Sequence, residues 1–118
     1  MTADFPIEMP VYLRLRGLLA AAILDGSFGE GDQLPSVRAF AAEHGANPLT
    51  VAKAYQSLQD DGYVAVRRGV GMFVADGAIQ QLRDDERNRF MTQSWPRIRA
   101  HIDRIGIEPH SLFPREEV

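Results

Sequence analysis

The chain has 118 residues, 45% hydrophobic and 25% charged, which is enough for one modest core but hardly for two. It contains no cysteine, which excludes a disulfide framework, a thiol nucleophile and a cysteine-ligated metal site. Its net charge of −3 argues against a nucleic-acid partner unless basic residues gather locally. No leader pattern and no run of about 18 apolar residues occurs, so the sequence predicts a cytoplasmic protein without a membrane span.

The first predicted element is a helix from Pro10 to Gly26, which begins at a proline and ends at a glycine. Its apolar residues recur at helical spacing and predict a buried stripe: Tyr12, Leu15, Leu19, Ala22 and Ile23. Gly17 in the middle costs about 1 kcal/mol relative to alanine, so it is either tolerated or marks the close approach of another backbone.

A second and a third helix follow, with only a short glycine turn between them. The second is predicted from Val37 to His44, because Ser36 can cap its start and Gly45 can end it. The third is predicted from Asn47 to Gly62, because Asn47 can cap its start. Pro48 fits the first helical position, since a backbone N–H there would have no partner within the helix. Such a pair is typical of a helix-turn-helix, whose second helix enters the major groove of DNA.

The third helix has two unlike faces. Its predicted buried stripe consists of Val51, Ala54, Tyr55 and Leu58. Another face carries short polar groups and one cation, which suit a major groove: Thr50, Lys53 and Ser57. An ordinary amphipathic surface helix would show the same pattern, so the assignment depends on the neighbouring elements.

After Gly62 the pattern changes from helical to alternating. Residues 63–67 and 72–75 are predicted as the strands of a hairpin with a glycine-rich tip. A hairpin directly after a helix-turn-helix is a wing, and Arg67 and Arg68 at its tip can enter a minor groove. The alternative is a solvated turn with ordinary charges. No acid lies between Gly45 and Gln59, so a local positive face on an acidic chain is consistent with the sequence.

Residues 76–113 are predicted to form a tail of two helices, the second capped by Ser94 and ended by Gly106. The apolar residues of the tail have no spare core within the chain, so we expect them to form a homodimer interface. These residues are Ile79, Leu82, Phe90, Trp95, Ile98, Ile102 and Ile105. The alternative is that the tail folds back on the winged domain of its own chain. Residues 114–118 are expected to be disordered.

Three segments, in this order and spacing, resemble the signature of GntR-type winged-helix transcription regulators. They are Gly31-Asp-Gln-Leu-Pro-Ser-Val-Arg38, Asn47-Pro-Leu-Thr-Val-Ala-Lys-Ala-Tyr55 and Gly69-Val-Gly71. Met72 departs from the family, which commonly has threonine there, and Phe40 and His44 stand where leucines are more usual. The short tail is similar to the YtrA-like branch, which implies a dimer and operons that often encode ABC transporters.

By position, the resemblance implies DNA contacts from Arg38, Asn47, Leu49, Thr50, Arg68 and Gly69. We add Ser36, Lys53 and Arg67 as candidates, since each lies on or beside these segments and carries a hydroxyl or a cation. Tyr55 is expected in the core, with a phosphate contact of its hydroxyl as the alternative.

Together these observations predict an α+β, mostly helical protein, with residues 1–75 as a winged helix-turn-helix domain and residues 76–113 as a dimerisation tail. The predicted function is a homodimeric, sequence-specific repressor that binds an inverted-repeat operator in double-stranded DNA. A winged helix that contacts proteins is the alternative. No enzyme, metal or cofactor is expected, because His44, His101 and His110 show no catalytic or metal-binding spacing. No effector can be assigned, and any inducer would bind between the tail and the winged domain or between subunits.

Overall fold

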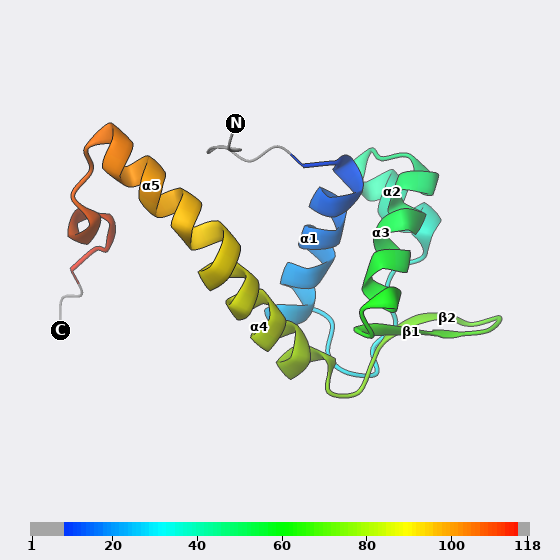
Figure 1. The fold of residues 1–118 in the computed structure, drawn as a ribbon. Coiled ribbons are helices and arrows are strands. Elements are labelled where there is room, and N and C mark those ends of the chain that lie inside the picture. The colour runs from blue at the N-terminus through cyan, green and yellow to red at the C-terminus, as the bar shows by residue number, and fades with distance from the viewer. Residues whose placement is uncertain (1–8, 116–118) are drawn as a thin grey trace. The chain divides into compact units, whose positions relative to one another are not determined.

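The computed structural model describes residues 9–115 (Figure 1). Within this range the chain divides into two compact units, residues 9–85 and residues 86–115, which are described separately. The expectation of disorder for residues 116–118 lies outside the described residues, as does the start of the predicted winged domain, residues 1–8.

The first unit contains three helices, a two-stranded hairpin and the first part of a fourth helix. These elements are α1 (Val11–Leu24), α2 (Val37–His44), α3 (Pro48–Asp60), β1 (Val64–Arg67), β2 (Gly71–Val74) and α4 (Ala78–Arg89). The strands are antiparallel, with Val64 opposite Val74 and Arg67 opposite Gly71. The hairpin projects away from the three helices (Figure 1). The predicted winged helix-turn-helix is confirmed.

Side-chain caps and a glycine set the turn between α2 and α3. The Ser36 hydroxyl accepts a hydrogen bond from the Ala39 amide at 3.1 Å, and the Asn47 side chain accepts one from the Leu49 amide at 2.8 Å. Gly45 ends α2 in the left-handed conformation with φ of 60°, which glycine adopts without steric cost. The predicted starts and the end of α2 therefore follow from local chemistry.

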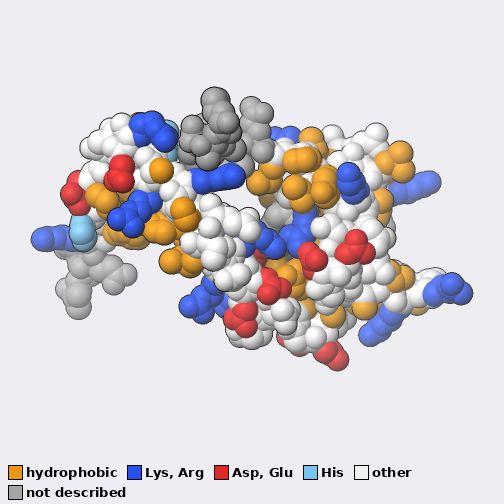
Figure 2. All heavy atoms as spheres, in the orientation of Figure 1, with side chains coloured by type: hydrophobic (Ala, Val, Ile, Leu, Met, Phe, Trp, Pro, Cys, Tyr) orange, Lys and Arg blue, Asp and Glu red, His pale blue; other side chains and the backbone are white. Residues whose placement is uncertain are grey.

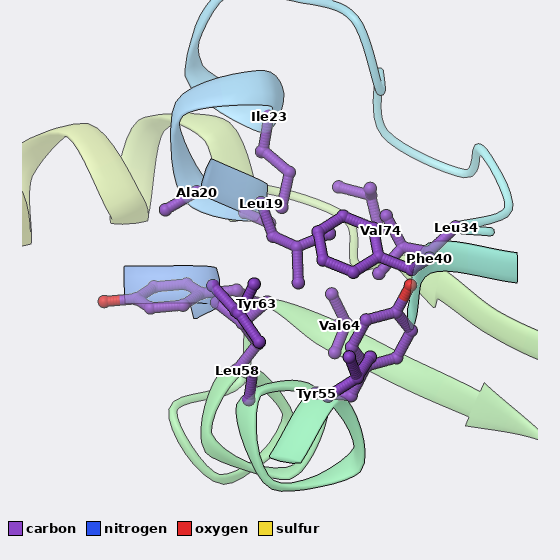
Figure 3. Packing of buried hydrophobic residues seen from close by; sticks show 14 of the residues in the cluster. Leu19, Ala20, Ile23, Leu34, Phe40, Tyr55, Leu58, Tyr63, Val64 and Val74 are labelled. Atoms are coloured by element: carbon purple, nitrogen blue, oxygen red, sulfur yellow. The ribbon is translucent and has the colours of Figure 1, made fainter. Parts of the chain in front are cut away.

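The core lies between α1, α3 and the hairpin, with α2 closing one side (Figure 3). The predicted stripe of α3 is confirmed, since Val51, Ala54, Tyr55 and Leu58 are all buried. The stripe of α1 is rotated from the prediction, because Tyr12 and Ala22 are only half-buried whereas Ala20 is buried. The rotation also turns Arg16 inward.

Arg16 of α1 is a buried charge, with 7% of its surface exposed. Its guanidinium donates to the carboxylate of Asp61 at the end of α3 and lies 5.8 Å from the centre of the Tyr63 ring. The Tyr63 hydroxyl in turn donates to the Asp85 carboxylate of α4. Burying a cation is costly unless it is paired, and this cluster pairs it while joining α1, the end of α3 and α4. No pattern in the sequence predicted this cluster.

The beginning of α4 belongs to the core of the first unit. Ala78 and Leu82 are buried there, Leu82 with 0% exposure, and Ile79 packs against the same cluster. This corrects the prediction that Leu82 lies at a dimer interface, because its side chain is already enclosed by its own chain. The compact unit also ends within α4 at Asp85, later than the predicted boundary at residue 75.

The second unit is helical. After the end of α4 come a π-helical turn (Phe90–Ser94), α5 (Trp95–Ile105) and a short 3-10 helix (Pro109–Leu112). Gly106, with φ of 77°, ends α5 as predicted. No helix among the described residues has the length and apolar character that a membrane crossing requires.

The predicted N-cap at Ser94 is wrong. Ser94 has helical φ and ψ angles of −81° and −50° and makes no side-chain cap, so the two tail helices are joined without a break. In a regular helix the ring of Pro96 would clash with the carbonyl of residue 92. The wider turn directly before it, in which the Trp95 amide bonds the Phe90 carbonyl, gives the ring room.

Replacing Gly17 with alanine is expected to raise the free energy of unfolding by about 1 kcal/mol. Gly17 is exposed in α1, and a methyl group there would meet no atom within 4 Å, so the glycine is tolerated rather than needed. Urea titration followed by circular dichroism measures the change. Gly45→Ala is the control and should destabilise, because an alanine is strained at φ of 60°. A destabilised Gly17→Ala variant would contradict this description of α1.

Candidate nucleic-acid interface

The start of α3 presents one apolar and two polar candidates. Leu49 is 81% exposed, so its side chain has no place in the core, and Thr50 is half-buried beside it. The side-chain oxygen of Asn47 accepts the Leu49 amide, which leaves its NH2 group as a donor. This end of α3 therefore offers a hydroxyl, an amide donor and a hydrocarbon group, all of which can contact the edges of bases.

The start of α2 adds Arg38 and Ser36. Arg38 is exposed in the first turn and forms no salt bridge with any described residue. The Ser36 oxygen accepts the Ala39 amide as a cap, while its hydroxyl hydrogen remains available for donation. A guanidinium at this place can bind a phosphate or take up a bidentate contact with guanine.

Lys53 of α3 is exposed, whereas Tyr55 of the same helix is buried. The Lys53 ammonium lies 4.3 Å from the centre of the Tyr12 ring of α1, a cation–π contact at an exposed site. The Tyr55 ring is buried, and its hydroxyl donates to the Pro35 carbonyl at 2.6 Å. The predicted place of Tyr55 in the core is thus confirmed, and its hydroxyl is already used within the chain.

The tip of the wing carries the remaining candidates. The Arg67 guanidinium lies 4.2 Å from the centre of the Phe73 ring, so it is held along the hairpin. Arg68 is exposed, with no salt bridge to a described residue, and Gly69 has φ of 77°. Basic side chains stand at the far end of the wing (Figure 2). Arg38, Lys53, Arg67 and Arg68 supply the local positive charge that an acidic chain needs to bind DNA.

Gln33 also belongs to this surface, although no pattern in the sequence predicted it. Its side-chain amide donates to the Val70 carbonyl at the wing tip, at 2.9 Å, and its backbone forms a bridge with Phe73 of β2. Next to it, the Leu34 amide donates to the Met72 carbonyl at 2.8 Å. Gln33 lies inside the first signature segment, but no spacing along the chain indicates a contact with the wing.

Met72 marks the departure from the family pattern in the wing. Its side chain is half-buried and packs against the core, so it does not offer the hydroxyl that threonine would supply. The backbone pairing of the hairpin is unaffected at this position, where Met72 stands opposite Val66. The departure therefore changes a side-chain contact and leaves the fold intact.

A helix pair with a capped turn, followed by a two-stranded basic wing, defines the class of winged helix-turn-helix DNA-binding proteins. Residues 11–74 match the family described as bacterial regulatory proteins, gntR family. The chain belongs to this family and is a DNA-binding transcription regulator, not an enzyme. The resemblance to GntR-type regulators is confirmed.

Individual relatives extend the comparison beyond the winged unit. The HTH-type transcriptional regulator YhcF of Bacillus subtilis is 33% identical over 86 residues, which cover 71% of each chain. The HTH-type transcriptional repressor YtrA of the same organism is 38% identical over 69 residues, 58% of this chain and 53% of YtrA. A GntR family transcriptional regulator from Listeria monocytogenes has a similar structure, with a TM-score of 0.71, 25% identity and coverage of 92% and 93%. These matches support the predicted similarity to the short YtrA-like regulators.

Proposed function

We propose that this regulator is a homodimeric repressor that binds an inverted-repeat operator, with the start of α3 in the major groove and the wing in the adjacent minor groove. The similarity to the repressor YtrA supports the sign of regulation. The resemblance to the YtrA-like branch extends the proposal to an operon that encodes a transporter. Arg38 and Thr50 would then contact base edges and nearby phosphates, and Arg68 the minor groove.

The main support for dimerisation is the apolar surface of the second unit. Large hydrophobic side chains there are between 45% and 73% exposed: Phe90, Met91, Ile105, Leu112 and Phe113. The rings of Phe90 and Trp95 stack with centres 6.4 Å apart, which makes a continuous aromatic surface. A two-fold dimer buries the same patch of both copies, so one such surface is sufficient for self-association.

The predicted interface residues of the second unit differ in how exposed they are. Ile102 is only 6% exposed within a single chain, and Ile98 is half-buried. Phe90 and Ile105 are 45% and 54% exposed and remain the better candidates from the predicted set, whereas Trp95 is half-buried like Ile98. An experiment on the interface is therefore best directed at fully accessible side chains, because changing Ile102 would also disturb packing within the chain.

The double variant Met91→Asp, Ile105→Asp is expected to sediment as a monomer, because a dimer would have to bury four added carboxylates. Binding-site selection from random duplexes should yield an inverted repeat for the unaltered protein, with half-site centres about one helical turn or a multiple apart. Leu18→Asp, at an exposed leucine of α1, is the matched control and should leave both results unchanged. A single asymmetric site, or a variant that remains a dimer, would contradict the proposed assembly.

A further inference from the structure

Gln33 connects the loop before α2 with the tip of the wing. Its side-chain nitrogen donates to the Val70 carbonyl at 2.9 Å. The approach is close enough that a Cβ atom at Gly71 would lie 2.5 Å from that same nitrogen. Gly71, with φ of 147°, thus supplies both the backbone conformation and the space that the contact needs.

Packing alone holds the tip weakly. In β1 only Val64 is buried, and the residues that lead to the tip are exposed. A hollow of about 310 Å³ lies beside the hairpin, with Pro35, Val37, Val66 and Met72 in its walls. Backbone hydrogen bonds with residues 31–34 hold β2 at Val74 and Met72, so the part that resembles an isolated, marginally stable hairpin is the tip beyond Met72.

The contact of Gln33 restrains this tip. It is a side-chain hydrogen bond to the tip segment 67–71 from a residue outside the hairpin. Gln33 also forms a backbone bridge with Phe73 of β2. The ring of Phe73 in turn contacts the Arg67 guanidinium. The loop before α2 is therefore joined to the wing by a side-chain contact at Val70 and a backbone bridge at Phe73.

We propose that Gln33 is a positioning residue for DNA binding, which holds the wing tip so that Arg68 reaches the minor groove; this rests on the proposed placement of the wing in that groove. A tip that is already ordered loses less conformational freedom when it binds, and the difference adds to the affinity. Gln33 itself need not touch DNA. Its effect passes through Arg68.

The test is a double-mutant cycle of Gln33→Met and Arg68→Ala, measured by anisotropy titration on the selected duplex at several salt concentrations. Methionine has a similar length but cannot donate to the Val70 carbonyl. Gln33→Met is expected to weaken binding about three- to tenfold and to make the salt dependence shallower, with an unchanged melting temperature. In the Arg68→Ala background the same change should have no further effect.

A control variant and the unaltered protein separate the possible failures. Gln80→Met changes an exposed glutamine of α4 that bonds Asp84, and it should bind DNA normally. The role of Gln33 would be overturned if Gln33→Met weakened DNA binding equally with and without Arg68, or did not weaken it at all. Failure of the unaltered protein to bind any selected duplex would instead overturn the proposed function.

Discussion

Arg38→Ala is expected to weaken binding to the selected operator by about 1–3 kcal/mol, which corresponds to about fivefold to 150-fold. Arg38 is exposed at the start of α2 and forms no salt bridge with a described residue, so its charge is available to a guanine or a phosphate. Binding to unrelated DNA should weaken less, so the ratio of the affinities for operator and unrelated DNA should fall. Thr50→Ala should act in the same direction, because Thr50 lies in the first turn of α3 and its hydroxyl can bond a base edge or a phosphate.

Arg68→Ala should give a different pattern. A minor-groove arginine responds mainly to charge and groove width, so affinities for operator and scrambled DNA should fall together. The slope of log affinity against log salt should become shallower by about one unit.

Fluorescence-anisotropy titrations on both duplexes at several salt concentrations distinguish these patterns. Arg83→Ala is the matched control, since Arg83 is an exposed arginine of α4 beside Gln80. An Arg68→Ala variant with unchanged affinity and slope would show that the wing lies outside the groove.

The free energy of unfolding is expected to fall by several kcal/mol between pH 10 and pH 12, because two buried tyrosines would lose their protons. Burial, with the nearby charge of Glu43, raises the pKa of Tyr55 to about 12. Burial, together with the hydrogen bond to Asp85, raises the pKa of Tyr63 to about 12. The folded chain thus holds both phenolic protons more tightly than the unfolded chain does. This stabilisation is complete below pH 10 and is lost as the pH rises to 12.

Each tyrosine contributes at most about 3 kcal/mol to this pH dependence, since one pKa unit corresponds to about 1.4 kcal/mol. Urea titrations at pH 8, 10, 11 and 12 would measure it. In each single variant, Tyr55→Phe or Tyr63→Phe, the free energy of unfolding should fall by less between pH 10 and pH 12. In the double variant most of this pH dependence should disappear. A double variant that loses as much stability as the unaltered protein above pH 10 would exclude these two tyrosines as the cause.

Elements with strong local signals could be predicted well. The caps Ser36 and Asn47 and the glycine at position 45 act within a few residues of themselves, and the structure shows each in its predicted role. The stripe of α3 was predictable because helical period and burial coincide at Val51, Ala54, Tyr55 and Leu58. The alternation in the hairpin similarly predicted both strands, to within one residue.

Features that depend on distant partners could not be predicted in this way. Arg16 is buried because Asp61 is placed next to it, and the two are 45 residues apart in the sequence. Leu82 looked like an interface residue since nothing local shows that α4 starts within the core. The π-helical turn makes room for the Pro96 ring, which would clash with the preceding turn of a regular helix. The sequence instead suggested a helix start, because Ser94 is a typical capping residue.

The candidate site was predictable to the extent that a family signature marks positions. The resemblance indicated Arg38, Asn47, Leu49, Thr50, Arg68 and Gly69, and the structure brings them to the start of α2, the start of α3 and the wing tip. Gln33 was missed because its role depends on Val70 and Gly71, which pair with it only in the folded chain.

The way α4 begins also limits how the winged part can be moved between proteins. A fragment that stops at Ala75, where the wing ends, would lack Ala78, Leu82 and Asp85. It would open a leucine-sized gap in the core and leave the Tyr63 hydroxyl without its acceptor. A portable DNA-binding module must therefore extend at least to Asp85, and exchange of tails between relatives would preserve folding only at junctions beyond that residue.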